Sequence, residues 1–261
     1  MPKNTTTTDT TARKKQRRSA AIAASVAVAA ILLGTVSYTA TRPEARTDTA
    51  DQQQADTTEA KDELTDKLVK LARRDAKDPL AQGRADAPVV LIEYADFKCG
   101  YCGKFARDTE PDLVKKYVDD GTLRIEWRNF PIFGADSQSA ARAAWAAGQQ
   151  GRFWQFHKAA YAEGAKEKGF GADRLDALAR EAGVDDLDKF RQDSGGKAAH
   201  AAVKQDSDEA YALGATSTPS FLINGQPIAG AQPEAAFEQA IEAAKAESAK
   251  SESAKSGGGG K

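Results

Sequence analysis

The tetrapeptide CGYC at residues 99–102 holds both cysteines of the chain and constrains its fold most strongly. Shortly before it lies an apolar run at residues 89–95 (VVLIEYA), interrupted only by Glu93. Such a run is typical of a strand that is covered on both faces. A helix is expected to start at the cysteines, and the partial positive charge of a helix N-terminus stabilises a thiolate. The sequence therefore predicts a central strand that leads to a reactive thiol, Cys99.

Two cysteines separated by two residues suit thiol–disulfide exchange, because one sulfur forms a mixed disulfide and the second resolves it. We predict Cys99 as the nucleophile and Cys102 as the resolving thiol. A purely structural disulfide is the first alternative, but so short a loop gains little stability from it. A zinc site is the second, but the two histidines, His157 and His200, lie far from the pair in sequence. We expect a redox-active disulfide, no metal and no other cofactor.

The segment after the cysteines predicts a parallel strand pair. A helix is expected through residues 108–120, with a kink at Pro111 and an end at Gly121. Apolar and charged residues then alternate over residues 123–128, which is typical of a second strand. Because a strand, a helix and a strand in this order form a right-handed crossover, the two strands should be parallel.

The second half of the chain predicts a helical insertion followed by a hairpin. Residues 137–213 show no strand pattern and consist of helical stretches separated by glycines. Residues 221–229 favour a β-hairpin, because the Asn-Gly pair at 224–225 suits the positive φ angles of a type I′ turn. A last helix is expected at 234–244. The order βαβ, helical insertion, ββα predicts an α/β fold with a central mixed sheet.

The N-terminal region carries a topology signal. The basic run RKKQRR at residues 13–18 precedes residues 19–41, which carry no charge. As a helix this stretch would be about 34 Å long, enough to cross a hydrocarbon core of roughly 30 Å. The positive-inside rule keeps the basic run in the cytoplasm and places the rest of the chain outside. A cleaved signal peptide is the alternative, although no good cleavage site is present. Either interpretation exports the protein.

The region between this anchor and the strand is expected to be a spacer and a docking helix. Residues 42–58 contain no Leu, Ile, Val or aromatic residue and cannot form a core. Leu64, Leu68 and Leu71 share one face of a helix predicted over 59–75. The predicted parts are a cytoplasmic tail (1–18), a transmembrane anchor (19–41), a spacer with docking helix (42–82), the main domain (83–244) and a flexible tail (245–261).

Composition and missing signatures exclude several function classes. The chain has 37 Lys plus Arg against 38 Asp plus Glu, a net charge of −1, so no field attracts nucleic acid. Signatures of serine hydrolases, zinc proteases and phosphate loops are missing from the sequence. His157 lies in an aromatic-rich helical stretch and is expected to be structural.

Glu93 and the Thr218-Pro219 pair each allow two interpretations. Glu93 lies inside the predicted central strand, where an unpaired carboxylate is costly. It can serve as a proton carrier for Cys102, its pKa raised by desolvation, or face the surface in a salt bridge. Pro219 precedes the hairpin strand, where a proline can simply be an edge residue without a donor.

Four features together resemble the thioredoxin superfamily, and more closely the exported DsbA-like thiol:disulfide oxidoreductases, including membrane-anchored forms of Gram-positive bacteria. They are the strand VVLIEYADF leading into CxxC, the segment RNFP at residues 128–131, the helical insertion, and the segment TPSFLING at residues 218–225. The resemblance covers residues 83–244 and implies a thioredoxin-like fold.

The resemblance also implies roles for single residues. It implies that Pro219 is cis and places the backbone of Thr218 beside the sulfurs, where it pairs with a substrate chain, and that Glu93 is the buried acid. DsbA-type proteins often carry Pro-His between the cysteines, whereas this chain has Gly100 and Tyr101. A strongly oxidising potential is therefore not implied. Tyr101 offers an apolar face to unfolded substrates or covers the helix start.

The function implied by the resemblance is oxidation of cysteine pairs in exported proteins. Unfolded or folding proteins with free thiols would be the substrates, and a membrane oxidase would regenerate the disulfide of Cys99 and Cys102. Two alternatives stay open. The same fold can work as a reductase or isomerase, or it can be a non-catalytic thioredoxin-like binding module with an inert cysteine pair.

Overall fold

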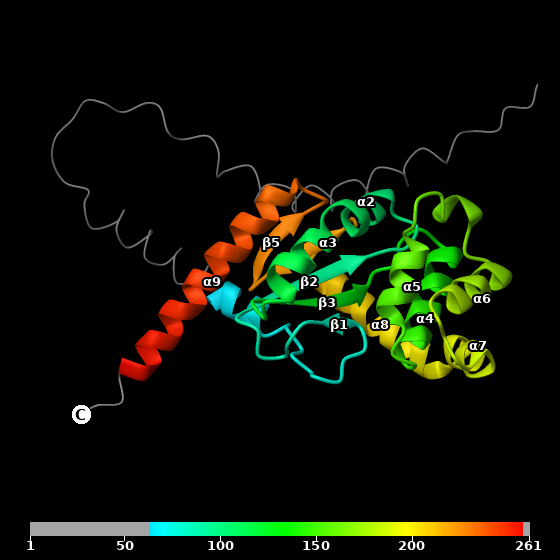
Figure 1. Cartoon of the computed structure of the whole chain (residues 1–261), viewed down its shortest axis with the longest axis horizontal. Helices are drawn as coiled ribbons and strands as arrows, with labels where there is room; N and C mark the ends of the chain where they lie inside the picture. Colours follow the sequence, from blue (N-terminus) through cyan, green and yellow to red (C-terminus); the bar gives the residue numbers. More distant parts are fainter. Residues whose placement is uncertain (1–62, 258–261) are drawn as a thin grey trace, which may run out of the picture. The chain divides into compact units, whose positions relative to one another are not determined.

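The structure is a computed structural model that describes residues 63–257 (Figure 1). Its strands are β1 (Ala81–Gln82), β2 (Val89–Ala95), β3 (Leu123–Asn129), β4 (Ser220–Ile223) and β5 (Gln226–Ala229). Its named helices are α2 (Gly100–Asp108), α3 (Glu110–Leu113), α4 (Ala135–Gly148), α5 (Phe153–Ala160), α6 (Ala172–Glu181), α7 (Leu187–Gly195), α8 (Lys197–Ala212) and α9 (Glu234–Gly257). A π-helical turn, η1 (Val114–Val118), follows α3, and a 3-10 turn, η2 (Lys166–Lys168), lies between α5 and α6.

The described strands form one mixed sheet in the order β1-β3-β2-β4-β5. β2 is the central strand and pairs in parallel with β3, which confirms both predictions from the apolar run and the crossover. β4 pairs antiparallel with the other edge of β2, and β1 and β5 add antiparallel edge strands. In this register Glu93 lies opposite Trp127 of β3 and Phe221 of β4.

The hairpin between β4 and β5 follows the predicted turn chemistry. Asn224 and Gly225 have φ angles of 43° and 82°, as a type I′ turn requires. A Cβ on Gly225 would lie only 2.9 Å from the backbone oxygen of Thr65, so this position also needs the small residue. The Asn224 side chain accepts the N–H of Val90 and thereby ties the turn to β2.

Apolar clusters cover both faces of the sheet. Helices α2, α3 and α9 pack on one face, and α8 packs on the other with residues from 68 to 72. The first cluster includes Val89, Leu91, Phe105, Leu113, Leu123, Ile125, Phe221, Ile223, Phe237 and Ile241. The second includes Val90, Ile92, Tyr94, Phe130, Ala210 and Leu222. Because neighbouring residues of a strand point to opposite faces, Glu93 shares the face of Leu91.

The helical insertion predicted at residues 137–213 is present as α4 to α8. Figure 1 places α4, α5, α6 and α7 at the end of the sheet to which the arrows of β2 and β3 point. These helices pack around Phe97 and Trp127 in a cluster that also contains both cysteines. The insertion therefore lies against the end of the sheet where the CGYC motif begins. Helix α7 and the two-residue strand β1 were not predicted, because neither has a clear periodic pattern.

The flanking segments differ from the predictions. The docking helix covers only residues 63–69 of the described chain, and residues 71–75 are irregular. Leu68 and Leu71 pack on the sheet as expected, whereas Leu64 is 56% exposed. Helix α9 continues to Gly257, well beyond residue 244, because Ala, Glu and Lys in this stretch favour helix.

The predicted transmembrane anchor, residues 19–41, lies outside the described residues, as do the segments 1–18 and 42–62. Among the helices within residues 63–257, none combines the length and the apolar character needed to cross a bilayer.

Strand β3 carries a buried cluster of charges on its α8 side. Alternating charged residues usually indicate a solvated face, yet all seven residues of β3 are buried. The carboxylate of Glu126 accepts four hydrogen bonds: from the side chains of Arg124 and Arg128, both at 2.8 Å, and from the backbone N–H groups of Arg73 and Arg74, at 2.9 and 2.8 Å. This arrangement leaves the charge of Glu126 fully compensated.

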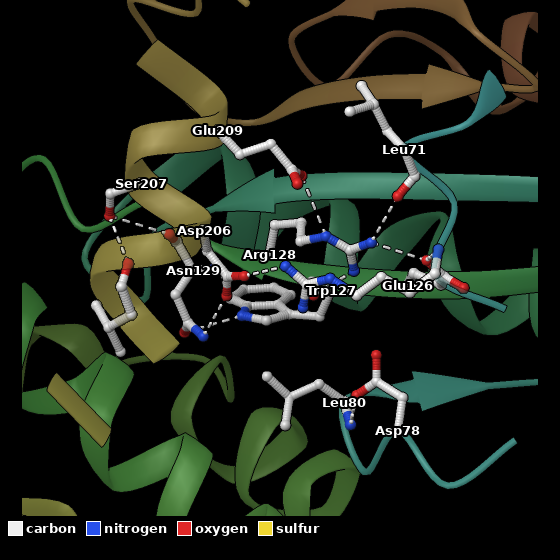
Figure 2. Close-up of polar contacts among 12 residues, drawn as sticks. Leu71, Asp78, Leu80, Glu126, Trp127, Arg128, Asn129, Asp206, Ser207 and Glu209 are labelled. Carbon is white, nitrogen blue, oxygen red and sulfur yellow. Dashed lines mark hydrogen bonds and ion pairs between the residues drawn. The ribbon is translucent and has the colours of Figure 1, made fainter. Parts of the chain in front are cut away.

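The same cluster joins β3 to α8 and to residues 71–75, called here the N-terminal segment (Figure 2). Arg128 donates to the backbone oxygen of Leu71 at 3.2 Å and to Glu209 of α8 at 3.3 Å. Asp206 of α8 accepts the backbone and side-chain N–H groups of Asn129 at 2.9 and 3.1 Å. Charged hydrogen bonds, rather than apolar packing alone, therefore hold the N-terminal segment and α8 on β3.

Candidate active site

Cys99 caps the N-terminus of α2. Its sulfur accepts the backbone N–H of Cys102 at 3.4 Å and donates to the backbone oxygen of Thr218 at 3.2 Å. Hydrogen bonding lowers the pKa of Cys99 to about 6, and the largest contribution comes from the Cys102 thiol. Thr218 and backbone N–H groups of α2 add to this effect, whereas desolvation opposes it. Cys99 is therefore set up as a thiolate near neutral pH.

Cys102 has the opposite environment. It is fully buried, whereas Cys99 is 5% exposed, and both are free thiols in this structure. Burial, and then the neighbouring Cys99, raise the pKa of Cys102 well above its ordinary value. A proton must therefore leave Cys102 before it can attack, and must return to it when it departs from a disulfide. Such a thiol fits the resolving position of an exchange pair.

The Thr218–Pro219 peptide bond is cis and lies beside the cysteines. Both residues are buried, and the contact between the Thr218 carbonyl and Cys99 joins the loop before β4 to the start of α2. The geometry that the resemblance implied for this loop is thus present. Its role toward a substrate stays a prediction.

Gly100 and Tyr101 form the exposed first turn of α2. Tyr101 is 68% exposed, one of few large apolar side chains of the described chain that face solvent. A cavity of about 270 Å³ opens beside Cys99 and Gly100, and its other wall is formed by residues 160–167 of the insertion. The Nζ of Lys166 lies 3.0 Å from the place a Cβ on Gly100 would take. The helical insertion thus contributes directly to the surroundings of the nucleophile.

Glu93 is fully buried on the central strand. Neither of its carboxyl oxygens has a hydrogen-bond partner among the described residues, and no ion pair reaches it there. The alternative of a surface-facing or salt-bridged Glu93 is therefore wrong. Burial, and then the charges of Glu110 and Cys99, raise the pKa of Glu93 well above its ordinary value. The raised pKa favours the protonated form of Glu93, from which the carboxyl can give up a proton.

Glu110 is a further buried acid near the site and was not among the predicted site residues. This residue begins α3, is 6% exposed, and accepts a hydrogen bond from Gln82 of β1 at 3.2 Å. Burial raises the pKa of Glu110 to about 8. Its spacing from Cys102, eight residues along nearly continuous helix, places both on one helical face. The sequence therefore contained a signal for Glu110: an acidic residue on the same helical face as the buried Cys102.

His157 lies next to Glu110, with 3.7 Å between His157 Nδ1 and Glu110 Oε2. It is 3% exposed among aromatic rings, and burial lowers its pKa to about 3, so it is neutral at physiological pH. His200 takes no part in the site. Within residues 63–257, no group of His, Cys, Asp and Glu side chains is arranged to hold a metal ion.

Comparison with protein families places most of the described chain in one family. The thioredoxin family model Thioredoxin_4 matches residues 75–243. The probable disulfide bond formation protein D of Bacillus cereus is 33% identical over 148 residues, which cover 55% of this chain and 68% of that protein. The Na(+)/H(+) antiporter NhaA 3 of Salinispora tropica is 34% identical over 151 residues. This match spans only 21% of the antiporter, so it concerns one part of a much longer protein.

Solved structures share the fold. A thioredoxin-like oxidoreductase from Silicibacter pomeroyi has a TM-score of 0.58 at 29% identity, covering 66% of this chain and 94% of that one. α-DsbA1 of Wolbachia pipientis has a TM-score of 0.57 at 26% identity, covering 65% and 92%. Oxidised BdbD of Bacillus subtilis reaches 0.60 at 23% identity, covering 66% and 95%, and supports the fold alone. The chain therefore belongs to the thioredoxin superfamily, among the DsbA-like thiol:disulfide oxidoreductases.

Proposed function

We propose that this protein is a disulfide donor that oxidises cysteine pairs in exported proteins. The observation that carries the proposal is the contrast within the cysteine pair: Cys99 has a pKa of about 6, whereas the pKa of the buried Cys102 is raised. A thiolate that is stabilised in the reduced protein favours the reduced form, which makes the disulfide a better oxidant.

The reaction proceeds by two exchange steps. A substrate thiolate attacks Sγ of Cys99 in the oxidised protein, the bond between the two cysteines breaks, and Cys102 leaves and takes up a proton from Glu93. A second substrate thiolate then attacks the substrate sulfur of the mixed disulfide, and Cys99 leaves as a thiolate. Two electrons pass from the substrate dithiol to the protein, which ends with both cysteines reduced.

The exposed first turn of α2 and the loop before β4 form the proposed docking site. Support comes from the 3.2 Å contact between Cys99 and the Thr218 carbonyl, and from the exposure of Tyr101. An extended substrate segment would pair with the backbone at Thr218, beside the cis Pro219. Gly100 leaves the approach to Cys99 free of a side chain, while Tyr101 offers an aromatic surface to unfolded chains.

We place this activity outside the cytoplasmic membrane, with the chain held there by residues 19–41. A membrane oxidase would regenerate the disulfide by accepting two electrons from the Cys99 thiolate and the Cys102 thiol, a step that releases the one proton of Cys102. Support comes from the name of the Bacillus cereus relative, which is a disulfide bond formation protein, and from the basic run that precedes an uncharged stretch. Exported proteins with free thiols are the substrate class.

The test of the proposal is the reduction potential of the purified protein, equilibrated with graded glutathione buffers and followed by thiol trapping. We expect a value well above about −270 mV, the value of thioredoxin. A value at or below that of thioredoxin would favour a reductase instead. Cys99→Ser should abolish oxidation of a dithiol peptide, and unchanged oxidation would remove the cysteine pair from the function.

A further inference from the structure

Several buried polar groups between the sheet and helices α2 and α5 have no hydrogen-bond partner. Within the described part of the chain these include both carboxyl oxygens of Glu93, Nε2 of His157 and the hydroxyl of Tyr161. Buried polar groups are nearly always hydrogen-bonded, so a cluster of unpaired ones needs an explanation. The exchange reaction proposed above uses Glu93 but leaves the other two without a role.

These groups are linked by contacts that lead away from the cysteines. Glu93 lies opposite Trp127 in the β2–β3 register, on the same face of the sheet. The ring of Trp127 lies 5.1 Å from that of His157, which in turn lies 4.9 Å from the ring of Tyr161. His157 is 3.7 Å from the carboxyl of Glu110. The two buried acids, Glu93 and Glu110, therefore border one shared cluster.

A cavity of about 490 Å³ lies at the Glu110 end of this cluster. Its walls include Gln82, Glu110, Trp154 and His157, but neither of the two cysteines and not Glu93. This cavity is larger than the cavity beside Cys99, which has about 270 Å³. Glu110 thus borders a cavity that the buried sulfur of Cys102 does not reach.

We propose that Glu110, with His157 beside it, is the second station of a proton path that connects Cys102 through Glu93 to this cavity. The inference rests on the proposed disulfide exchange, because only that reaction produces and consumes a proton at Cys102. Glu110 touches no reacting sulfur. It is a positioning residue that acts through Glu93, because it supplies a proton to that carboxyl or takes one from it.

The proton balance is closed at each step. When Cys102 leaves the disulfide as a thiolate, it takes the proton of Glu93. The resulting carboxylate takes a proton from Glu110, and Glu110 recovers one from water that enters the cavity. No electron moves along this path. When Cys102 attacks a mixed disulfide in the reverse reaction, the proton travels the same way outward. His157 is neutral and keeps the Glu110 carboxyl in place.

Electrostatics supports the two acids as a working pair. Burial, and then a negative charge on Glu110, raise the pKa of Glu93; burial raises the pKa of Glu110 to about 8, although its hydrogen bond from Gln82 opposes this. Because the two charges repel each other, ionisation of one acid favours the protonated form of the other, so their proton equilibria are linked. The other titratable groups that face Glu110 are His157 and Lys158 from α5, Tyr161 directly after α5, and Arg107 from α2; the two cations border the same cavity.

The experiment measures oxidation of a synthetic peptide with two cysteines by the oxidised full-length protein, in stopped flow across pH 5–9. Glu110→Gln should slow the reaction about tenfold at pH 7 and remove the dependence on a group with a pKa of about 8. Its thiolate titration at Cys99 should stay unchanged. Asp112→Asn, an exposed carboxyl on the same short helix, is the control and should behave like the wild type.

Chemical rescue provides a second, independent readout. Glu110→Ala widens the cavity and should regain rate when sodium formate is added, whereas sodium chloride should have no effect. Should Glu110→Ala fail to fold, ¹³C NMR of carboxyl-labelled wild-type protein replaces it: the Glu93 signal should respond to the titration of Glu110. If the Glu93 and Glu110 carboxyls titrated independently of each other, the proposed proton path would be wrong.

The two proposals fail separately. If the wild-type protein does not oxidise the peptide at all, the proposed function is wrong. If the wild type oxidises it and Glu110→Gln matches the wild type at every pH, disulfide exchange stands and the proton path through Glu110 is wrong. Formate that leaves the rate of a folded Glu110→Ala protein unchanged would contradict the path in the same way.

Discussion

Glu93 and Glu126 lie on adjacent central strands, and both are fully buried, yet they are opposite kinds of acid. Glu126 faces the α8 side. Although burial opposes its ionisation, hydrogen bonds from Arg124, from the backbone of Arg73 and from Arg128 lower its pKa to about 2. Glu93 faces α2 without any such donor among residues 63–257, and burial raises its pKa. Burial alone therefore does not decide whether an acid is charged; the donors around it do.

This difference divides the sheet into two faces with separate tasks. On the α8 face the charge of Glu126 holds the side chains of Arg124 and Arg128 and the backbone of residues 73–74 in place. On the α2 face, the raised pKa values of Glu93 and Glu110 favour their protonated forms. The α2 face is the less stable of the two. Burying Glu93 without a hydrogen-bond partner costs folding free energy, whereas the hydrogen bonds of Glu126 offset the cost of its burial.

The largest expected effect comes from Glu126→Leu. This substitution leaves the guanidinium groups of Arg124 and Arg128 buried without their shared carboxylate, so the free energy of unfolding should fall by about 3–5 kcal/mol. Urea denaturation at pH 7 measures it. Glu63→Leu, at an exposed acid paired with Lys67, is the control and should change stability by less than about 1 kcal/mol. If Glu126→Leu lowered the free energy of unfolding as little as the control does, the proposed difference between the two faces of the sheet would be wrong.

The same substitution at Glu93 should have the opposite sign. Glu93→Leu removes an unpaired buried acid and fills its space with an apolar side chain, so the free energy of unfolding should rise by about 1–3 kcal/mol. Peptide oxidation should slow by a factor of at least about 100, since Cys102 loses its proton partner. Equilibrium unfolding and stopped-flow kinetics on one preparation give both values. A variant that is less stable than the wild type would refute the comparison.

The two faces should also give opposite pH dependences. Glu126, with its lowered pKa, contributes stability above pH 4.5 that is lost as the pH falls toward 2. Glu110, with its raised pKa, should make the protein less stable as the pH rises from 4.5 through about 8, because the folded state must hold its proton. Unfolding curves from pH 3 to 9 test this. Glu110→Gln should flatten the alkaline side only.

The smallest expected effect concerns Cys99. Hydrogen-bond donors lower the pKa of its thiol, as they lower the pKa of Glu126. Iodoacetamide should modify Cys99 with a midpoint near pH 6. Cys102→Ala removes the main stabilising hydrogen bond and should raise that midpoint, while the helix N-terminus keeps it below the value of a free thiol, about 8.5. An unchanged midpoint in Cys102→Ala would assign the stabilisation to the helix and to Thr218 instead.

Local patterns in the sequence were enough to predict the elements that carry the reaction. The apolar run at 89–95 indicated the central strand, CGYC indicated a thiolate at a helix start, and the Asn-Gly pair at 224–225 indicated the hairpin turn. Each of these depends on residues a few positions apart, whose geometry is set by helix and strand periodicity. The thioredoxin-like order of elements followed from them.

Only the tertiary structure decided what covers each face. The alternating charges of β3 predicted a strand but not what covers it: residues 71–75 and α8, which are distant in sequence, enclose it, and Arg73 and Arg74 donate backbone N–H groups to Glu126. The fold brings Glu110 at the start of α3 to within 3.7 Å of His157 in α5, and no pattern within either segment predicts that proximity. Periodicity tells which side of an element is covered, whereas the charge of a buried group depends on which donors the fold brings to it.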